Sequence, residues 1–318
     1  MRALVLAVVI VFAAPAPAGA RFALGIGDQS TRMLEDPRFA ALGVRDSRLV
    51  VPYDVALDPV QLERYAPVLE LARARAVRML VSFAASARAP AHLPSVRSYR
   101  RAVRAFRARF PWVHDLGAWN EANHASQPTA RHPGRAAQLY NALQAECRRC
   151  RVVAADVLDQ AGFAAWVRRF RRIARAPRIW GLHDYVDVNR FRDVSVPRMR
   201  RATGRRGQVW LTETGGVVRF ARSFGYDERR AARSTRHVLR LAARRGVRRV
   251  YLYQWTGAPL GARWDSGLIA ADGRPRPALN VVERFLGVPV TALPPIPVVP
   301  RFPVAPGAPP STGGVEAP

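Results

Sequence analysis

Eight short apolar runs rich in β-branched residues alternate along this chain with segments whose apolar residues recur every three to four positions. This alternation is typical of parallel βαβ units, because two parallel strands need a crossover connection, usually a helix. The expected strands cover residues 22–27, 47–53, 78–83, 113–120, 151–157, 179–185, 208–213 and 249–255. Eight parallel strands are the number that closes a barrel.

The segments between these strands have the period of amphipathic helices, with arginines opposite the apolar positions. Asp58 before Pro59 and an acidic residue at Asp227 predict helix starts, and Gly246 predicts a helix end. The expected long helices cover residues 59–76, 96–110, 134–147, 163–174 and 227–245, and two shorter ones cover 36–42 and 194–206.

The fold class that follows is α/β, a single (β/α)8 TIM barrel. A doubly wound open sheet is the competing architecture, and it usually carries a glycine-rich phosphate turn after its first strand. Here Gly25 and Gly27 are followed by Asp28, and the third glycine of that turn is missing. The barrel is therefore the favoured prediction.

Both ends of the chain differ in composition from the barrel segment. Residues 1–20 have a basic Arg2, an apolar run over 3–14 and small residues at 18–20, which predicts a signal peptide rather than a membrane span. Residues 288–318 are rich in Pro, Val, Ala and Gly and predict a disordered tail. Residues 21–287 remain as one catalytic barrel domain, and we expect a secreted or cell-envelope protein.

The formal net charge of +28 raises the possibility of a nucleic-acid partner. All basic residues are arginines, however, and they recur on nearly every expected helix instead of gathering in one stripe. We therefore expect no nucleic-acid binding, whereas electrostatic association with anionic cell-wall polymers suits so basic a surface. We expect a monomer.

Cys147 and Cys150 are the two cysteines of the chain, spaced C-x-x-C where a helix runs into a strand. A metal site would need further ligands that the sequence does not supply. A local disulfide and two ordinary thiols both remain open.

Two carboxylates stand where a barrel enzyme carries its reactive groups, at the carboxyl ends of strands. Glu121 follows Asn120 at the end of the fourth strand, and Glu213 ends the seventh. Strands three apart face each other across the mouth of a barrel. Glycosidic cleavage needs this arrangement, because one carboxyl group protonates the leaving oxygen while the other acts at the anomeric carbon.

Further polar and aromatic residues end neighbouring strands. His183 and Tyr185 have the same parity on the sixth strand and are expected to hydrogen-bond the carboxylate of Glu213. Trp255 ends the eighth strand and could form the floor of a sugar site. Candidates for additional substrate contacts are Asp28, Tyr53, Asp54, Asn123, His124, Trp264 and Asp265.

These motifs together resemble the clan A glycoside hydrolases, which carry an Asn-Glu pair at the end of strand four and a Glu at the end of strand seven. His183-x-Tyr185 is similar to the strand-six pattern of the clan, and Trp255 to its strand-eight aromatic residue. Arg48 resembles the strand-two arginine that contacts the nucleophile. The resemblance covers nearly the whole barrel segment, and the order of the motifs makes it specific.

The resemblance implies a retaining O-glycosyl hydrolase that acts on a poly- or oligosaccharide. Glu121 would be the general acid/base, with a raised pKa, and Glu213 the nucleophile. Asn120 would hydrogen-bond the 2-hydroxyl of the sugar. The chemistry needs no metal and no cofactor. The alternative function is a non-catalytic carbohydrate-binding or cell-wall-associated barrel, but binding alone would not need two opposed carboxylates.

Overall fold

The computed structural model describes residues 22–204, 206–221 and 223–297. The predicted signal peptide, 1–20, and residues 298–318 of the predicted tail lie outside the described residues. Within the described part, no helix combines the length and the apolar character that a membrane crossing requires.

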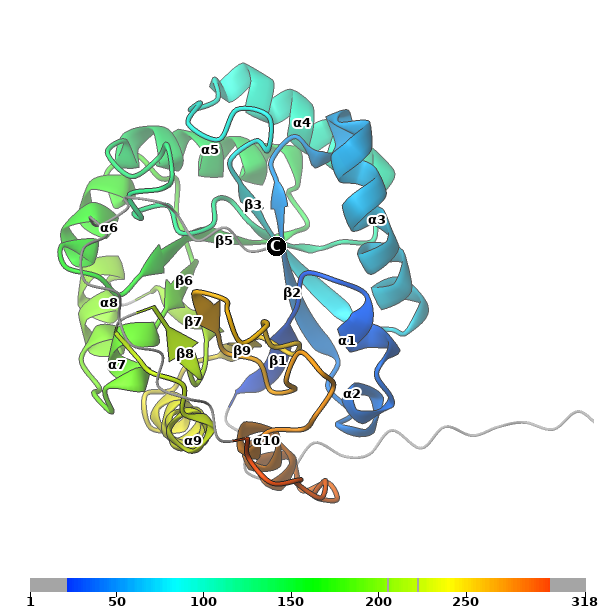
Figure 1. Ribbon diagram of the computed structural model, residues 1–318. Coiled ribbons are helices and arrows are strands. Elements are labelled where there is room, and N and C mark those ends of the chain that lie inside the picture. Colours follow the sequence, from blue (N-terminus) through cyan, green and yellow to red (C-terminus); the bar gives the residue numbers. More distant parts are fainter. Residues whose placement is uncertain (1–21, 205, 222, 298–318) are drawn as a thin grey trace, which may run out of the picture.

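The described residues form one closed barrel of parallel strands, which confirms the predicted fold class. Neighbouring strands follow chain order, and the last strand returns to pair with the first (Figure 1). The barrel strands are β1 (Ala23–Gly27), β2 (Asp46–Pro52), β3 (Arg78–Ala84), β4 (Asp115–Gly117), β5 (Arg151–Leu158), β6 (Ile179–His183), β7 (Gln208–Thr214) and β9 (Arg249–Tyr253). A separate two-stranded sheet pairs β8 (Arg219–Phe220) with β10 (Trp264–Asp265).

Helices surround the barrel as an outer ring (Figure 1). They are α1 (Arg32–Glu35), α2 (Pro37–Ala41), α3 (Pro59–Ala74), α4 (Val96–Arg109), α5 (Pro133–Glu146), α6 (Phe163–Arg171), α7 (Tyr185–Asn189), α8 (Ser195–Thr203), α9 (Glu228–Arg244) and α10 (Pro277–Leu286), with a 3-10 turn at Val55–Leu57. The predicted caps are confirmed: Asp58 and Asp227 each accept backbone N–H bonds in the first turn of their helix, and Gly246 has a left-handed φ of 58° after α9.

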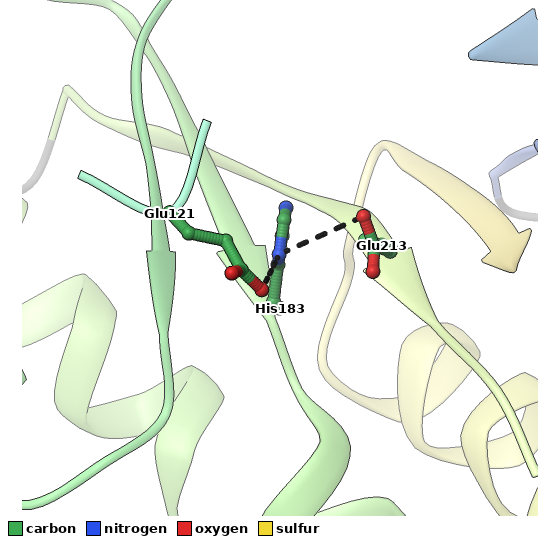
Figure 2. A group of neighbouring side chains, drawn as sticks. All are labelled: Glu121, His183 and Glu213. Atoms are coloured by element: carbon green, nitrogen blue, oxygen red, sulfur yellow. Dashed lines mark hydrogen bonds and ion pairs between the residues drawn. The ribbon is translucent and has the colours of Figure 1, made fainter. Parts of the chain in front are cut away.

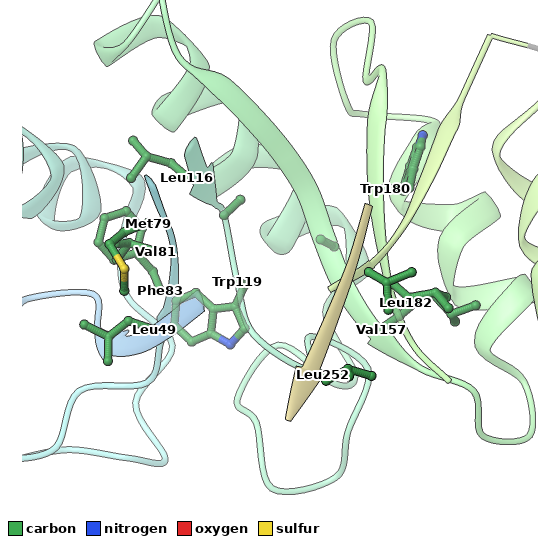
Figure 3. Packing of buried hydrophobic residues seen from close by; sticks show 14 of the residues in the cluster. Leu49, Met79, Val81, Phe83, Leu116, Trp119, Val157, Trp180, Leu182 and Leu252 are labelled. Carbon is green, nitrogen blue, oxygen red and sulfur yellow. The ribbon is translucent and has the colours of Figure 1, made fainter. Parts of the chain in front are cut away.

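The core has two parts. Side chains on the outer face of the strands pack against the helices, as Figure 3 shows for Met79, Trp180 and their neighbours. Inside the barrel, a second apolar layer consists of Leu80, Val153, Trp210 and Tyr251. This inner layer separates the two polar ends of the barrel.

Three strands end two or more residues earlier than the sequence predicts, and one of them, β9, ends at Tyr253, so that Trp255 lies in the loop after it. β4 ends at Gly117, and the chain turns at Glu121, which has a left-handed φ of 45°. β6 ends at His183, and Tyr185 begins α7. Tyr185 does reach Glu213 as predicted, but the start of a helix and not the pleat of a strand sets its direction.

Two barrel strands contain an irregularity near the carboxyl end. On β5, three residue steps from Val153 to Asp156 span the distance that two steps cover on β6. On β7, the same occurs from Trp210 to Glu213. An extra residue of this kind redirects the side chains that follow it, and both Asp156 and Glu213 lie directly after one.

The cysteines and the start of the predicted tail are both described. Cys147 and Cys150 form a disulfide between α5 and β5, with Cα atoms 5.3 Å apart. The Thr291 N–H donates to Glu283 of α10 over 3.0 Å, and the Asn280 amide donates to the Thr291 carbonyl over 2.9 Å. Hydrogen bonds therefore hold the chain against α10 as far as Thr291.

Candidate active site

The structure brings Glu121, His183 and Glu213 together at the carboxyl ends of the strands (Figure 2). The His183 ring lies between the two carboxylates: its Nδ1 is 3.2 Å from Glu121 Oε1 and 3.9 Å from Glu213 Oε2. One ligand atom from each residue lies within 4.8 Å of the others. Both carboxylates keep some solvent exposure, whereas the imidazole is completely buried.

Arg48 of β2 connects three polar side chains beneath the mouth of the barrel. Its guanidinium is 2% exposed and donates to Glu213 Oε2 over 2.6 Å and to Asn120 Oδ1 over 2.6 Å. It also donates to Asp156 Oδ2 on β5 over 2.9 Å. Asp156 was not predicted from the sequence. It could have been found there as the one acidic residue within the apolar run of β5.

Glu213 accepts hydrogen bonds at both oxygens. Arg48 occupies one, and the Tyr185 hydroxyl donates to Oε1 over 3.0 Å. Burial raises the pKa of Tyr185 well above its ordinary value, and the charge of Glu213 adds to this, so the phenol remains a donor. These two donors hold both oxygens of the carboxylate in place.

His183 and Glu121 form a coupled pair. Burial lowers the pKa of His183, but the charge of Glu213 and the bond to Glu121 outweigh this, and the pKa lies above its ordinary value of 6.5. Burial also raises the pKa of Glu121, yet the hydrogen bond and the charge of His183 outweigh it and leave that pKa lowered. The raised pKa expected for an acid is therefore wrong in this structure, because the hydrogen bond to His183 and the charge of that imidazole lower the pKa of Glu121.

Trp255 lies at the carboxyl end of the barrel but is buried. It is 1% exposed, packs edge-on against Phe39 of α2, and donates its indole N–H to Asp36 over 3.1 Å. With its ring covered, it has no face to offer a sugar, contrary to expectation, and it supports the loop after β9 instead. Tyr253, the last residue of β9, is an aromatic residue close to the site: burial and then the charge of Glu213 raise its pKa.

The additional candidates divide between the site and the loops. Trp264 packs edge-on against Tyr185 with ring centroids 4.9 Å apart, so it borders the site. Asp265 is paired with Arg276 over 2.6 Å and holds a loop. The other candidates also have partners in the structure: Asp28 accepts from Ser30 and Thr256, Tyr53 packs near Trp119, Asp54 accepts from Ser86, Asn123 binds Leu158, and His124 contacts Ser126.

Glu121, His183 and Glu213 are also close enough together to be considered as metal ligands. The Arg48 guanidinium, however, lies 2.6 Å from Glu213 Oε2 and 3.3 Å from His183 Nε2. A cation between the carboxylates would meet this fixed positive charge at close range, so we assign no metal to the site.

No protein-family model and no curated protein matches the chain. Solved structures do match. A family 39 glycoside hydrolase from the gut symbiont Bacteroides cellulosilyticus WH2 aligns over 83% of this chain and 63% of its own, with a TM-score of 0.59 and 13% identity. A family 39 β-xylosidase from Caulobacter crescentus aligns over 85% of this chain and 72% of its own, with a TM-score of 0.57 and 16% identity. An exo-β-1,4-mannosidase from Opitutaceae bacterium strain TAV5 aligns over 85% of this chain and 60% of its own, with a TM-score of 0.64 and 15% identity.

These matches have low sequence identity and show a shared fold. The (β/α)8 barrel of this chain is one that glycoside hydrolases use, which bears out the resemblance to clan A at the level of the fold. The chain spans less than two thirds of the first and third of these proteins.

Proposed function

We propose that the protein is a retaining O-glycosyl hydrolase in which Glu121 is the general acid/base and Glu213 the nucleophile. The observation that carries this proposal is the pair of carboxylates, whose nearest oxygens lie within 4.8 Å of each other. Retaining glycosidases have carboxyl groups about 5 to 5.5 Å apart, and inverting ones leave about 6.5 to 9.5 Å for a water molecule.

In the first step, Glu213 attacks the anomeric carbon and Glu121 protonates the departing oxygen. The proton that Glu121 needs can come from His183, whose Nδ1 lies 3.2 Å from Glu121 Oε1. Substrate that covers the site removes water and disfavours the charged imidazole, and transfer of the proton leaves a neutral imidazole and a carboxylic acid. In the second step, Glu121 takes a proton from water, which attacks the glycosyl-enzyme ester and releases Glu213.

Asn120 is held by Arg48 through its carbonyl oxygen, which leaves its amide N–H group for the 2-hydroxyl of the sugar. The Tyr185 phenol and the Arg48 guanidinium keep the oxygens of Glu213 oriented before attack. Side chains fixed in this way reduce the reorganisation that the transition state would otherwise require.

For the substrate, we propose a β-linked poly- or oligosaccharide. The proteins with the same fold include a β-xylosidase and an exo-β-1,4-mannosidase, so β-xylosides and β-mannosides are the first compounds to test. Electrostatic association with anionic cell-wall polymers agrees with the net charge of +28.

We also propose that the protein is a secreted or envelope-associated monomer. The Cys147–Cys150 disulfide supports export, since disulfides persist in oxidising compartments, and the features of residues 1–20 support a signal peptide. Fractionation of cells that express the full chain, with sequencing of the mature N-terminus, tests this. Full-length protein in the cytoplasm would contradict it.

A panel of aryl β-glycosides and polysaccharides tests the enzymatic proposal, with the anomer first released identified by NMR. We expect turnover with net retention, and no turnover by Glu213→Gln. Release of the inverted anomer would exclude the double-displacement mechanism. Binding of glycans without turnover would instead favour the alternative, a non-catalytic carbohydrate-binding barrel.

A further inference from the structure

Asp156 is a completely buried carboxylate that the mechanism above does not use. It lies on β5, inside the barrel and below the carboxylates of the site, and is 0% exposed. Its Oδ2 accepts from Arg48 over 2.9 Å and from the Ser82 hydroxyl over 2.7 Å. A buried carboxylate is costly unless such donors compensate it, so its presence here calls for a function.

The surrounding strands are built to admit this side chain. Gly181 on β6 has no side chain, and a Cβ atom there would lie 2.0 Å from Asp156 Oδ1. The irregularity on β5 directly precedes Asp156. Gly181 leaves the space for the Asp156 side chain, and the irregularity on β5 directs that side chain toward the guanidinium of Arg48.

Asp156 competes with Glu213 for the same cation. Arg48 gives its NH1 group to Glu213 and its NH2 group to Asp156 and Asn120. We propose that Asp156 is a positioning residue, which divides the charge of Arg48 between two carboxylates and thereby leaves Glu213 less neutralised and more nucleophilic. The expected effect of Asp156 on kcat rests on the proposed function, whereas its expected effect on the titration of His183 does not.

The electrostatic consequence falls on His183, which faces five charged or polar groups. Arg48 lies on the Nε2 side, Glu121 and Glu213 on the Nδ1 side, Asp156 below, and the Tyr185 hydroxyl beyond Glu213. The negative charge of Asp156 contributes to the raised pKa of His183, and the charge of His183 in turn favours ionised Asp156. Removal of the Asp156 charge should therefore make His183 easier to deprotonate.

The test variant is Asp156→Asn, which keeps the shape and removes the charge. The ring protons of His183, followed by NMR, should titrate at lower pH than in the parent protein, by on the order of one unit. With an aryl glycoside that the parent cleaves, kcat should fall about 10- to 100-fold while KM stays within about threefold, because Asp156 is buried away from substrate.

Asp115→Asn is the matched control. Asp115 is also a buried strand carboxylate paired with arginines, but at the opposite end of the barrel. It should lower stability without moving the His183 titration or the kcat of folded protein. A His183 midpoint and a kcat in Asp156→Asn that match those of Asp115→Asn would overturn the proposal.

Ser82→Ala keeps the proposal testable if Asp156→Asn does not fold. Loss of the hydroxyl leaves the Asp156 charge less compensated, so His183 should titrate a few tenths of a unit higher. An unchanged or lower midpoint would contradict the proposal. If the parent protein cleaves no glycoside at all, the proposed function fails, while the His183 titrations still decide whether Asp156 acts on the site.

Discussion

The two ends of the barrel use the same chemistry for different purposes. At each end a buried arginine lies between two strand carboxylates: Arg48 between Asp156 and Glu213 at the carboxyl end, and Arg249 between Asp46 and Asp115 at the amino end. The distances at the amino end, 2.8 and 3.4 Å, are those of ordinary ion pairs.

What differs is how completely the carboxylates are paired. At the amino end, Asp46 also binds Arg78 and Asp115 also binds Arg151, and Arg249 packs over the Trp210 ring at 4.7 Å. Three arginines thus neutralise two carboxylates, and both carboxylates of the amino end are fully paired.

At the carboxyl end, Arg48 and His183 face three acids, and two of these, Glu121 and Glu213, reach the mouth. We expect the network at the amino end to act in stability, and the network at the carboxyl end to act in the proposed chemistry.

The largest effect expected is at the carboxyl end. Glu213→Ala should lower kcat by about 10⁴-fold or more, because the covalent step has no other nucleophile. Added azide should restore cleavage of an activated aryl glycoside and give the inverted glycosyl azide, since the anion enters from the vacated side. Product stereochemistry is read by NMR.

Glu121→Ala should behave differently at the same end. A good leaving group needs little protonation, so the first step survives and the glycosyl-enzyme accumulates for want of a base. Azide should then give a product of retained configuration. If the two variants exchange their outcomes, the roles of acid/base and nucleophile are reversed.

The next effect concerns the amino end. Arg249→Met leaves Asp46 and Asp115 without their shared buried partner, and we expect the free energy of unfolding to fall by about 3 kcal/mol. Urea unfolding measures this loss. The kcat of folded protein should remain within about twofold, and a large drop in kcat without a loss of stability would erase the distinction between the two ends.

A smaller effect should follow from His183→Gln. In the proposed mechanism His183, whose pKa lies above 6.5, holds the proton that Glu121 donates. Without the imidazole Glu121 itself must hold this proton, so the alkaline limb of the kcat/KM profile should move down, toward the titration range of a carboxyl group. An unmoved alkaline limb would show that His183 does not control the acid.

The same variant should change the dependence of stability on pH. The folded pKa of His183 is raised, so its stabilising contribution is complete below the ordinary value of 6.5 and is lost as pH rises through the folded value. The stability difference between parent and variant should therefore be largest at acidic pH and shrink with rising pH in thermal unfolding. A difference that grows with pH would contradict this.

The smallest effect on stability is expected for an exposed arginine at the amino end of the barrel. The Arg78 side chain is 57% exposed while it pairs with Asp46, which keeps Arg249 as a second partner. Arg78→Gln should cost less than about 1 kcal/mol of unfolding free energy. A loss of unfolding free energy as large as that of Arg249→Met would mean that the exposed arginines stabilise the amino end as much as the buried one does.

The sequence by itself determined the architecture and the pair of carboxylates that we propose to react. Alternating apolar periods set eight strands and the helices between them, because burial of an apolar face is a local property of each segment. Glu121 and Glu213 could be found because the carboxyl ends of parallel strands meet at one end of a barrel. An error of a few residues in the predicted end of a strand does not change this.

The tertiary structure decided what local patterns cannot express. An extra residue on β5 and another on β7 redirect Asp156 and Glu213, and such irregularities depend on the register with neighbouring strands. The same packing buried Trp255 against α2. The lowered pKa of Glu121 also arose only in the fold, because the charge that causes it belongs to His183, 62 residues away along the chain.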